Sequence, residues 1–136
     1  MSRGYPLCWD LYTFAPGVSS PAAKRAAVES LCIALTEIDA EYLAAHRTPS
    51  LYQSGVRYRK DTGGVERQWW DVPKILAMGF ADCKGLAAWR AAELLMAGVP
   101  AEPFVTESRV SGTLLYHVRV RTPDGLEDPS RVLGMR

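Results

Sequence analysis

At 136 residues the chain is long enough for one domain with its own core, whereas two domains would each have only a marginal core. Its hydrophobic fraction of 48% and charged fraction of 23% exclude an intrinsically disordered chain. Sixteen basic against fifteen acidic residues give a net charge of +1, which gives no reason to expect binding to nucleic acid or to an anionic membrane. We therefore expect a single domain over residues 1–136 that recognises its partners at a specific site.

The first 20 residues lack the unbroken apolar run of an export signal, and no stretch approaches the roughly 18 apolar residues of a membrane span. The cysteines, Cys8, Cys32 and Cys83, are odd in number and widely spaced, which favours reduced thiols in a cytosol over a disulfide framework. A metal site has no support, because the chain contains no Cys-x-x-Cys or His-x-x-x-His pair. We expect a cytoplasmic protein with no membrane, metal or cofactor partner.

The first predicted element is a long helix from about Ala22 to Ala45. Ser20 is a suitable N-cap, and Pro21 suits the first helical position because its missing N–H would have no partner there. Apolar residues recur every three or four positions and form one stripe: Val28, Leu31, Leu35, Ile38 and Tyr42. We expect Cys32, which lies near this stripe, to be a small buried hydrophobe, and the same of Cys8.

The next segment is predicted to be irregular. Residues 51–59 show no periodicity, and residues 60–68 carry two glycines among charges, which is typical of a surface loop. Asp71 then suits the N-cap of a short helix, which Gly79 would end in a left-handed conformation.

Asp82 is the predicted N-cap of a second long helix, from Cys83 to Ala97, and Gly98 would follow its end. Small and apolar residues share one side of this helix, namely Cys83, Ala87, Ala91 and Leu94. Such a stripe is suited to close packing against a sheet. It also places Cys83 at a helix N-terminus.

Two or three antiparallel strands follow this helix. Residues 101–106 are predicted to form an edge strand because of Pro103, and residues 114–122 a stronger strand by their alternation. One face would hold Leu114, Tyr116, Val118 and Val120, and the other Leu115, His117, Arg119 and Arg121. A Thr-Pro-Asp-Gly turn at residues 122–125 then leads to a return strand that ends near Asp128.

These elements suggest a cysteine-based catalytic site. The positive end of a helix dipole stabilises a thiolate at Cys83, and the N–H groups there can bind an oxyanion. His117 is the candidate base, and Asp128 the residue that orients its ring through the nitrogen not facing the thiol. A two- or four-residue loop places Asp128 diagonal to His117, whereas a three-residue loop with a bulge places Glu127 on that face instead. We predict the even register, because an unpartnered aspartate on the apolar face would be costly.

The sequence Gly-Phe-Ala-Asp-Cys-Lys-Gly-Leu-Ala-Ala-Trp-Arg-Ala-Ala-Glu-Leu at 79–94, with Tyr-His-Val-Arg-Val at 116–120 and Asp-Pro-Ser at 128–130, resembles the transglutaminase-like superfamily of papain-like cysteine enzymes. The resemblance covers about the second half of the chain. It implies an α+β fold in which the helix that bears the cysteine packs on a small antiparallel sheet. It also implies thiol-dependent acyl transfer on amides, with Cys83, His117 and Asp128 as the triad. The phrase Ser-Gly-Val-Arg-Tyr at 54–58 looks like small members of this superfamily carried by bacteriophages.

Enzymes of this superfamily commonly add an oxyanion donor upstream of the cysteine. Gln68, Trp69 and Trp70 are the available donors, and we favour Trp70. The arginines Arg90, Arg119 and Arg121 are more typical of a solvated face than of a phosphate patch.

The reaction is open between hydrolysis by a peptidase or amidase and cross-linking to an amine, in either case on a protein or peptide substrate. The alternative is a binding or phage-assembly module that keeps the fold without turnover. Under that alternative the partner is a phage or assembly component, and the protein is located in the host cytoplasm or in the virion.

Overall fold

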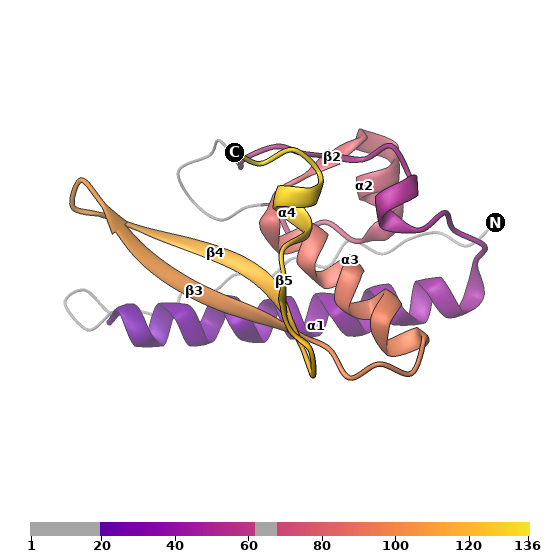
Figure 1. Cartoon of the computed structure of the whole chain (residues 1–136), viewed down its shortest axis with the longest axis horizontal. Coiled ribbons are helices and arrows are strands. Elements are labelled where there is room, and N and C mark those ends of the chain that lie inside the picture. The colour runs from indigo at the N-terminus through magenta and orange to yellow at the C-terminus, as the bar shows by residue number, and fades with distance from the viewer. Residues whose placement is uncertain (1–19, 62–67) are drawn as a thin grey trace.

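The computed structural model describes residues 20–61 and 68–136 (Figure 1). The elements in chain order are α1 (Pro21–Ala45), η1 (Leu51–Gln53), β1 (Arg57–Tyr58), α2 (Val72–Met78), β2 (Phe80–Ala81), α3 (Cys83–Met96), β3 (Glu102–Val110), β4 (Thr113–Thr122), β5 (Gly125–Glu127) and α4 (Pro129–Val132). Helices α1 and α3 pack together on one face of an antiparallel sheet with strand order β3-β4-β5. The predicted α+β class is therefore confirmed.

Helix α1 begins where the capping signal predicts. The Ser20 hydroxyl accepts a hydrogen bond from the Ala23 N–H at 3.1 Å, and Pro21 occupies the first turn. The buried side of the helix is rotated from the predicted stripe and consists of Val28, Cys32, Leu35, Thr36 and Asp39. Cys32 is fully buried, as expected, and Cys8 lies outside the described residues. None of the helices in the described segments is long and apolar enough to cross a bilayer.

The polar members of this buried side are each bound to backbone. The Thr36 hydroxyl donates to the Cys32 carbonyl at 2.8 Å, and an Asp39 carboxylate oxygen accepts from the Val72 N–H at 2.9 Å. Apolar periodicity alone did not predict their burial, because it depends on α2 and α3 packing over this side of α1.

Helix α3 is the centre of the molecule, since it contributes to two apolar clusters. The first lies between α1, α3 and the sheet and holds Val28, Cys32, Ala87, Ala91, Val105, Val118 and Val120. The second gathers around α2, α3 and the C-terminal turn and holds Leu51, Val56, Val72, Ile75, Ala81, Leu86, Trp89 and Leu133. A helix with apolar residues on most of its sides is expected to be enclosed in this way.

The starts of α2 and α3 confirm two predicted caps. The Asp71 carboxylate accepts from the Lys74 N–H at 3.1 Å, and Gly79 ends α2 with φ 80°. The Asp82 carboxylate accepts from the N–H groups of Lys84 at 3.1 Å and Gly85 at 3.3 Å. Two such caps in succession fix α3 so that Cys83 is its first residue.

The prediction of an irregular segment at residues 51–59 was wrong. Leu51 is fully buried in η1, and β1 pairs in parallel with β2, Arg57 opposite Phe80 and Tyr58 opposite Ala81. Two-residue strands that pair with a distant segment leave no local periodicity to detect. Most of the predicted 60–68 loop lies outside the described residues.

The sheet matches its prediction except in length. Strand β3 lies at an edge, as Pro103 indicated, but it extends to Val110 instead of ending near Thr106. It continues because Ser111 and Gly112 form a tight turn with positive φ values of 52° and 78°, so that the β3–β4 pairing runs to the hairpin tip. In Figure 1 this hairpin runs alongside α1. Val118 and Val120 face the helices and are fully buried.

Candidate active site

Cys83 lies at the first position of α3, directly after its N-cap Asp82. Its side chain is half-buried and packs at the margin of the cluster between α3 and the sheet. Tyr116, the residue before His117 on β4, packs on the same cluster. The start of α3 and the helix-facing side of β4 therefore meet at one cluster, and His117, the next residue after Tyr116, alternates to the other face of the strand.

Lys84, which follows Cys83, is a site residue that the sequence reasoning missed. Its side chain is 2% exposed, its ammonium group pairs with the Asp82 carboxylate, and it lies 3.7 Å from the Asp61 carboxylate. Asp61 also accepts a hydrogen bond from the Gln68 N–H at 3.0 Å. These contacts attach both flanks of residues 62–67 to the start of α3. The sequence held one signal of this burial, because Lys84 lies two residues after Asp82 and a buried lysine needs a carboxylate partner.

His117 and Asp128 are joined directly. His117 Nε2 lies 2.8 Å from Asp128 Oδ2, with the two side chains 27% and 17% exposed. The second carboxylate oxygen of Asp128 accepts from the Arg131 N–H at 3.4 Å and caps α4. One carboxylate thus serves both as helix cap and as partner of the imidazole, which restricts its orientation. The helix itself was not predicted, although an aspartate before Pro129 is a typical helix start.

The strand register explains why Asp128 reaches the ring. Thr122 pairs with Gly125, Arg121 with Leu126 and Val120 with Glu127. The loop therefore contains two residues, Pro123 and Asp124, and Asp128 comes next in register, opposite Arg119 and diagonal to His117. The even register predicted from the sequence is confirmed, and the alternative with a bulge at Gly125 is excluded.

The two neighbouring tryptophans lie in different places. Trp69 packs on the cluster that holds Cys83, and the Lys84 ammonium lies 5.3 Å from the centre of its ring. Trp70 packs on the other cluster, with its ring centre 5.5 Å from that of Phe80. Adjacent side chains diverge here, and Trp69 is the tryptophan that packs on the same cluster as Cys83. The choice of Trp70 as oxyanion donor stays a prediction. Gln68 is half-buried beside them.

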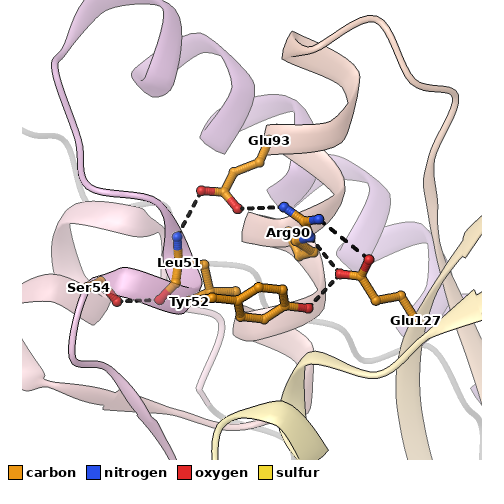
Figure 2. A network of polar contacts seen from close by, with 6 residues as sticks. All are labelled: Leu51, Tyr52, Ser54, Arg90, Glu93 and Glu127. Carbon is orange, nitrogen blue, oxygen red and sulfur yellow. Dashed lines mark hydrogen bonds and ion pairs between the residues drawn. The ribbon is translucent and has the colours of Figure 1, made fainter.

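Glu127, the alternative partner weighed for His117, takes part in a separate network (Figure 2). Its carboxylate accepts from Arg90 Nε at 2.5 Å and from the Tyr52 hydroxyl at 2.5 Å. Arg90 is thus a half-buried ion-pair partner, which corrects its expected place on a solvated face. Arg121 is exposed and pairs with Glu102 across the sheet.

The pKa shifts in this network favour the ionised forms of Glu127 and Arg90 and the neutral form of Tyr52. Burial raises the pKa of Glu127, but hydrogen bonds from Arg90 and Tyr52 and the Arg90 charge outweigh it, so that the pKa lies below its usual value. Burial lowers the pKa of Arg90, and its bonds to Glu127 reverse that effect and raise it. Burial and the Glu127 carboxylate also raise the pKa of the Tyr52 hydroxyl.

Within residues 20–61 and 68–136 no group of three or more histidine, cysteine, aspartate and glutamate side chains is placed to hold a metal ion. Comparisons of the chain with family models, with curated proteins and with solved structures found no match in any of the three. A functional assignment therefore depends on the site itself. The chemical features of that site are a thiol at a helix start and an imidazole–carboxylate pair on the neighbouring sheet.

Proposed function

We propose that the chain is a transglutaminase-like cysteine enzyme that transfers acyl groups from amide or peptide bonds of a protein or peptide substrate. Cys83 is the nucleophile, His117 the general base and Asp128 the residue that orients the imidazole. The observation that carries the proposal is the 2.8 Å contact between His117 Nε2 and Asp128 Oδ2, the oriented base that a cysteine nucleophile needs. The arrangement of α3 on an antiparallel sheet supports the resemblance noted from the sequence.

The tautomer of His117 follows from its partner. Asp128 accepts the proton on Nε2, so the lone pair on Nδ1 is left to receive the thiol proton. The thiolate then attacks the carbonyl carbon, and the resulting oxyanion is stabilised by donors near the helix start. The carbon–nitrogen bond breaks as the imidazolium returns its proton to the leaving amine. Water or an amine attacks the remaining thioester, which gives hydrolysis or cross-linking respectively, and regenerates the thiol.

Trp69 is the upstream residue that we assign to the substrate side of this site. Its indole N–H is a donor, and its side chain packs on the same cluster as Cys83, whereas Trp70 packs on the other cluster. The Lys84 contacts with Asp61 and Asp82 hold this segment against the helix start.

The proposal is tested by incubating the chain with a library of peptides and glutamine-containing donors, with and without an amine acceptor. We expect amide turnover together with an acyl adduct on Cys83 in intact-mass spectra. Cys83→Ser should lower kcat by a factor on the order of 10³ or more, because a serine hydroxyl is not ionised at neutral pH. Cys32→Ala, at the other described cysteine, should retain activity.

An electrophilic probe provides the deciding outcome. If the wild-type chain turns over no donor and the probe does not label Cys83, the catalytic proposal is overturned in favour of a binding or assembly module.

A further inference from the structure

Glu127 lies on the helix-facing side of the sheet. It pairs with Val120, whose side chain is fully buried, and paired residues of an antiparallel ladder share a face. Asp128, the next residue, is directed to His117. Successive residues at the end of β5 thus face opposite ways, one toward α3 and the other toward the imidazole.

Arg90 connects Glu127 to the helix that begins at Cys83. Seven residues separate Cys83 from Arg90 along α3, close to two full turns, so both lie along one side of the helix. Arg90 Nε and Nη2 lie 2.5 Å and 3.5 Å from the two carboxylate oxygens of Glu127 (Figure 2). This two-pronged geometry restricts both position and angle more than a single contact would.

The guanidinium of Arg90 is held from other directions as well. Its Nη1 lies 3.3 Å from Glu93, and the other carboxylate oxygen of Glu93 accepts from the Leu51 N–H at 2.9 Å. The Tyr52 ring lies 4.9 Å below the guanidinium, while its hydroxyl binds Glu127. Glu93 on α3 and Tyr52 in η1 therefore hold the Arg90 guanidinium from two further directions, which leaves it little freedom to rotate.

We propose that the Arg90–Glu127 ion pair, held by Tyr52, is a positioning device that fixes the His117–Asp128 pair relative to the Cys83 thiol. This inference rests on the proposed function. Cys83 and Arg90 belong to one helix, Glu127 and Asp128 are consecutive, and Asp128 binds the imidazole. The ion pair therefore links the helix that carries Cys83 to the strand end that holds His117. Neither Arg90 nor Glu127 acts on the substrate itself.

A matched pair on the same sheet separates this role from a general contribution to stability. Arg121 on β4 and Glu102 on β3 form another Arg–Glu ion pair, but both side chains are 51% exposed and no triad residue is adjacent to either. Glu127→Gln weakens the network while keeping the size of the side chain, and Glu102→Gln does the same to the control pair.

The experiment measures the rate of Cys83 alkylation by iodoacetamide from pH 4 to 10, in the wild type, His117→Ala, Glu127→Gln and Glu102→Gln. We expect the wild-type profile to depend on His117. Glu127→Gln should shift the pH midpoint of Cys83 reactivity toward that of His117→Ala. With a donor peptide that the wild type turns over, it should also lower kcat at least about tenfold with little change in KM. Glu102→Gln should match the wild type. A purely structural role would lower the melting temperature without moving the pH profile.

The outcomes for the two proposals are separable. If the profiles of wild type and His117→Ala coincide, the catalytic assignment fails. If they differ and Glu127→Gln follows the wild type, the positioning inference is overturned while the catalytic assignment stands. Should Glu127→Gln not fold, Tyr52→Phe removes only the hydroxyl contact to Glu127. A smaller shift in the same direction supports the inference, and an unchanged profile overturns it.

Discussion

At the scale of single residues, Asp128 combines a helix cap with a role that we propose in the chemistry. One carboxylate oxygen caps α4 and the other binds His117. A cap contributes about 1 kcal/mol to the free energy of unfolding, whereas orientation of a catalytic imidazole contributes to the barrier of the reaction. The two contributions can be separated by comparison with another aspartate that only caps.

Asp71 provides that comparison, because it caps the short helix α2 one residue before Val72-Pro73 and does not contact the imidazole. We expect Asp128→Ala and Asp71→Ala to lower the free energy of unfolding by similar amounts, about 1 kcal/mol each. Only Asp128→Ala should lower kcat, by a factor on the order of 10² to 10⁴. Denaturant unfolding and steady-state kinetics check this, and equal activity of the two variants would remove Asp128 from the site.

At the scale of elements, α3 depends on a close approach at Gly85. A Cβ at this position would lie 3.0 Å from Ile75 Cδ1 and 3.3 Å from the Ala81 Cβ. Alanine is favoured over glycine in a helix by about 1 kcal/mol, but overpacking of a buried contact costs about 1–3 kcal/mol. Crowding should therefore outweigh helix propensity.

We expect Gly85→Ala to lower the free energy of unfolding by about 1 kcal/mol. Ile75→Val removes the nearest methyl group, so the cost of Gly85→Ala should be smaller when Ile75→Val is already present. A double-mutant cycle by urea denaturation measures that coupling. Additive effects of the two substitutions would show that the contact with Ile75 is not what makes glycine necessary.

At the scale of the whole molecule, two carboxyl groups with shifted pKa values, Asp39 and Glu127, make stability depend on pH. Burial raises the pKa of Asp39 to about 8, and the charge of Asp71 adds to this rise. The hydrogen bond from the Val72 N–H acts in the opposite direction and lowers the pKa. Between the ordinary value of 3.8 and about 8 the folded state holds more protons than the unfolded state, so stability falls as pH rises. Glu127 acts oppositely, since its lowered pKa gives stability that is lost as pH falls below its ordinary value of 4.5.

These two groups predict a maximum of stability at about pH 4–5. Asp39→Asn keeps an oxygen for the Val72 N–H without a titrating proton, so it should stabilise the protein by a few kcal/mol at pH 7 and flatten the decline above pH 5. Glu127→Gln should flatten only the acid side. Urea denaturation from pH 3 to 8 checks both, with the exposed Glu37→Gln on α1 as control; an unchanged slope in Asp39→Asn would contradict the assignment.

The sequence by itself determined the features that depend on near neighbours in the chain. The caps at Ser20, Asp71 and Asp82 fixed three helix starts, and the Thr-Pro-Asp-Gly turn fixed a register that placed Asp128 beside His117. Capping and tight turns involve residues two to four positions apart, so their signals are local.

Only the tertiary structure decided which distant side chains meet. The parallel pairing of β1 with β2, the buried Asp39, the divergence of Trp69 from Trp70 and the Arg90–Glu127 pair all join segments far apart in the chain. A charged side chain has the same sequence signature whether it faces water or a partner. Its burial is set by the packing of α3 against its neighbours, and this is why the network beside the candidate triad could not be read from the sequence.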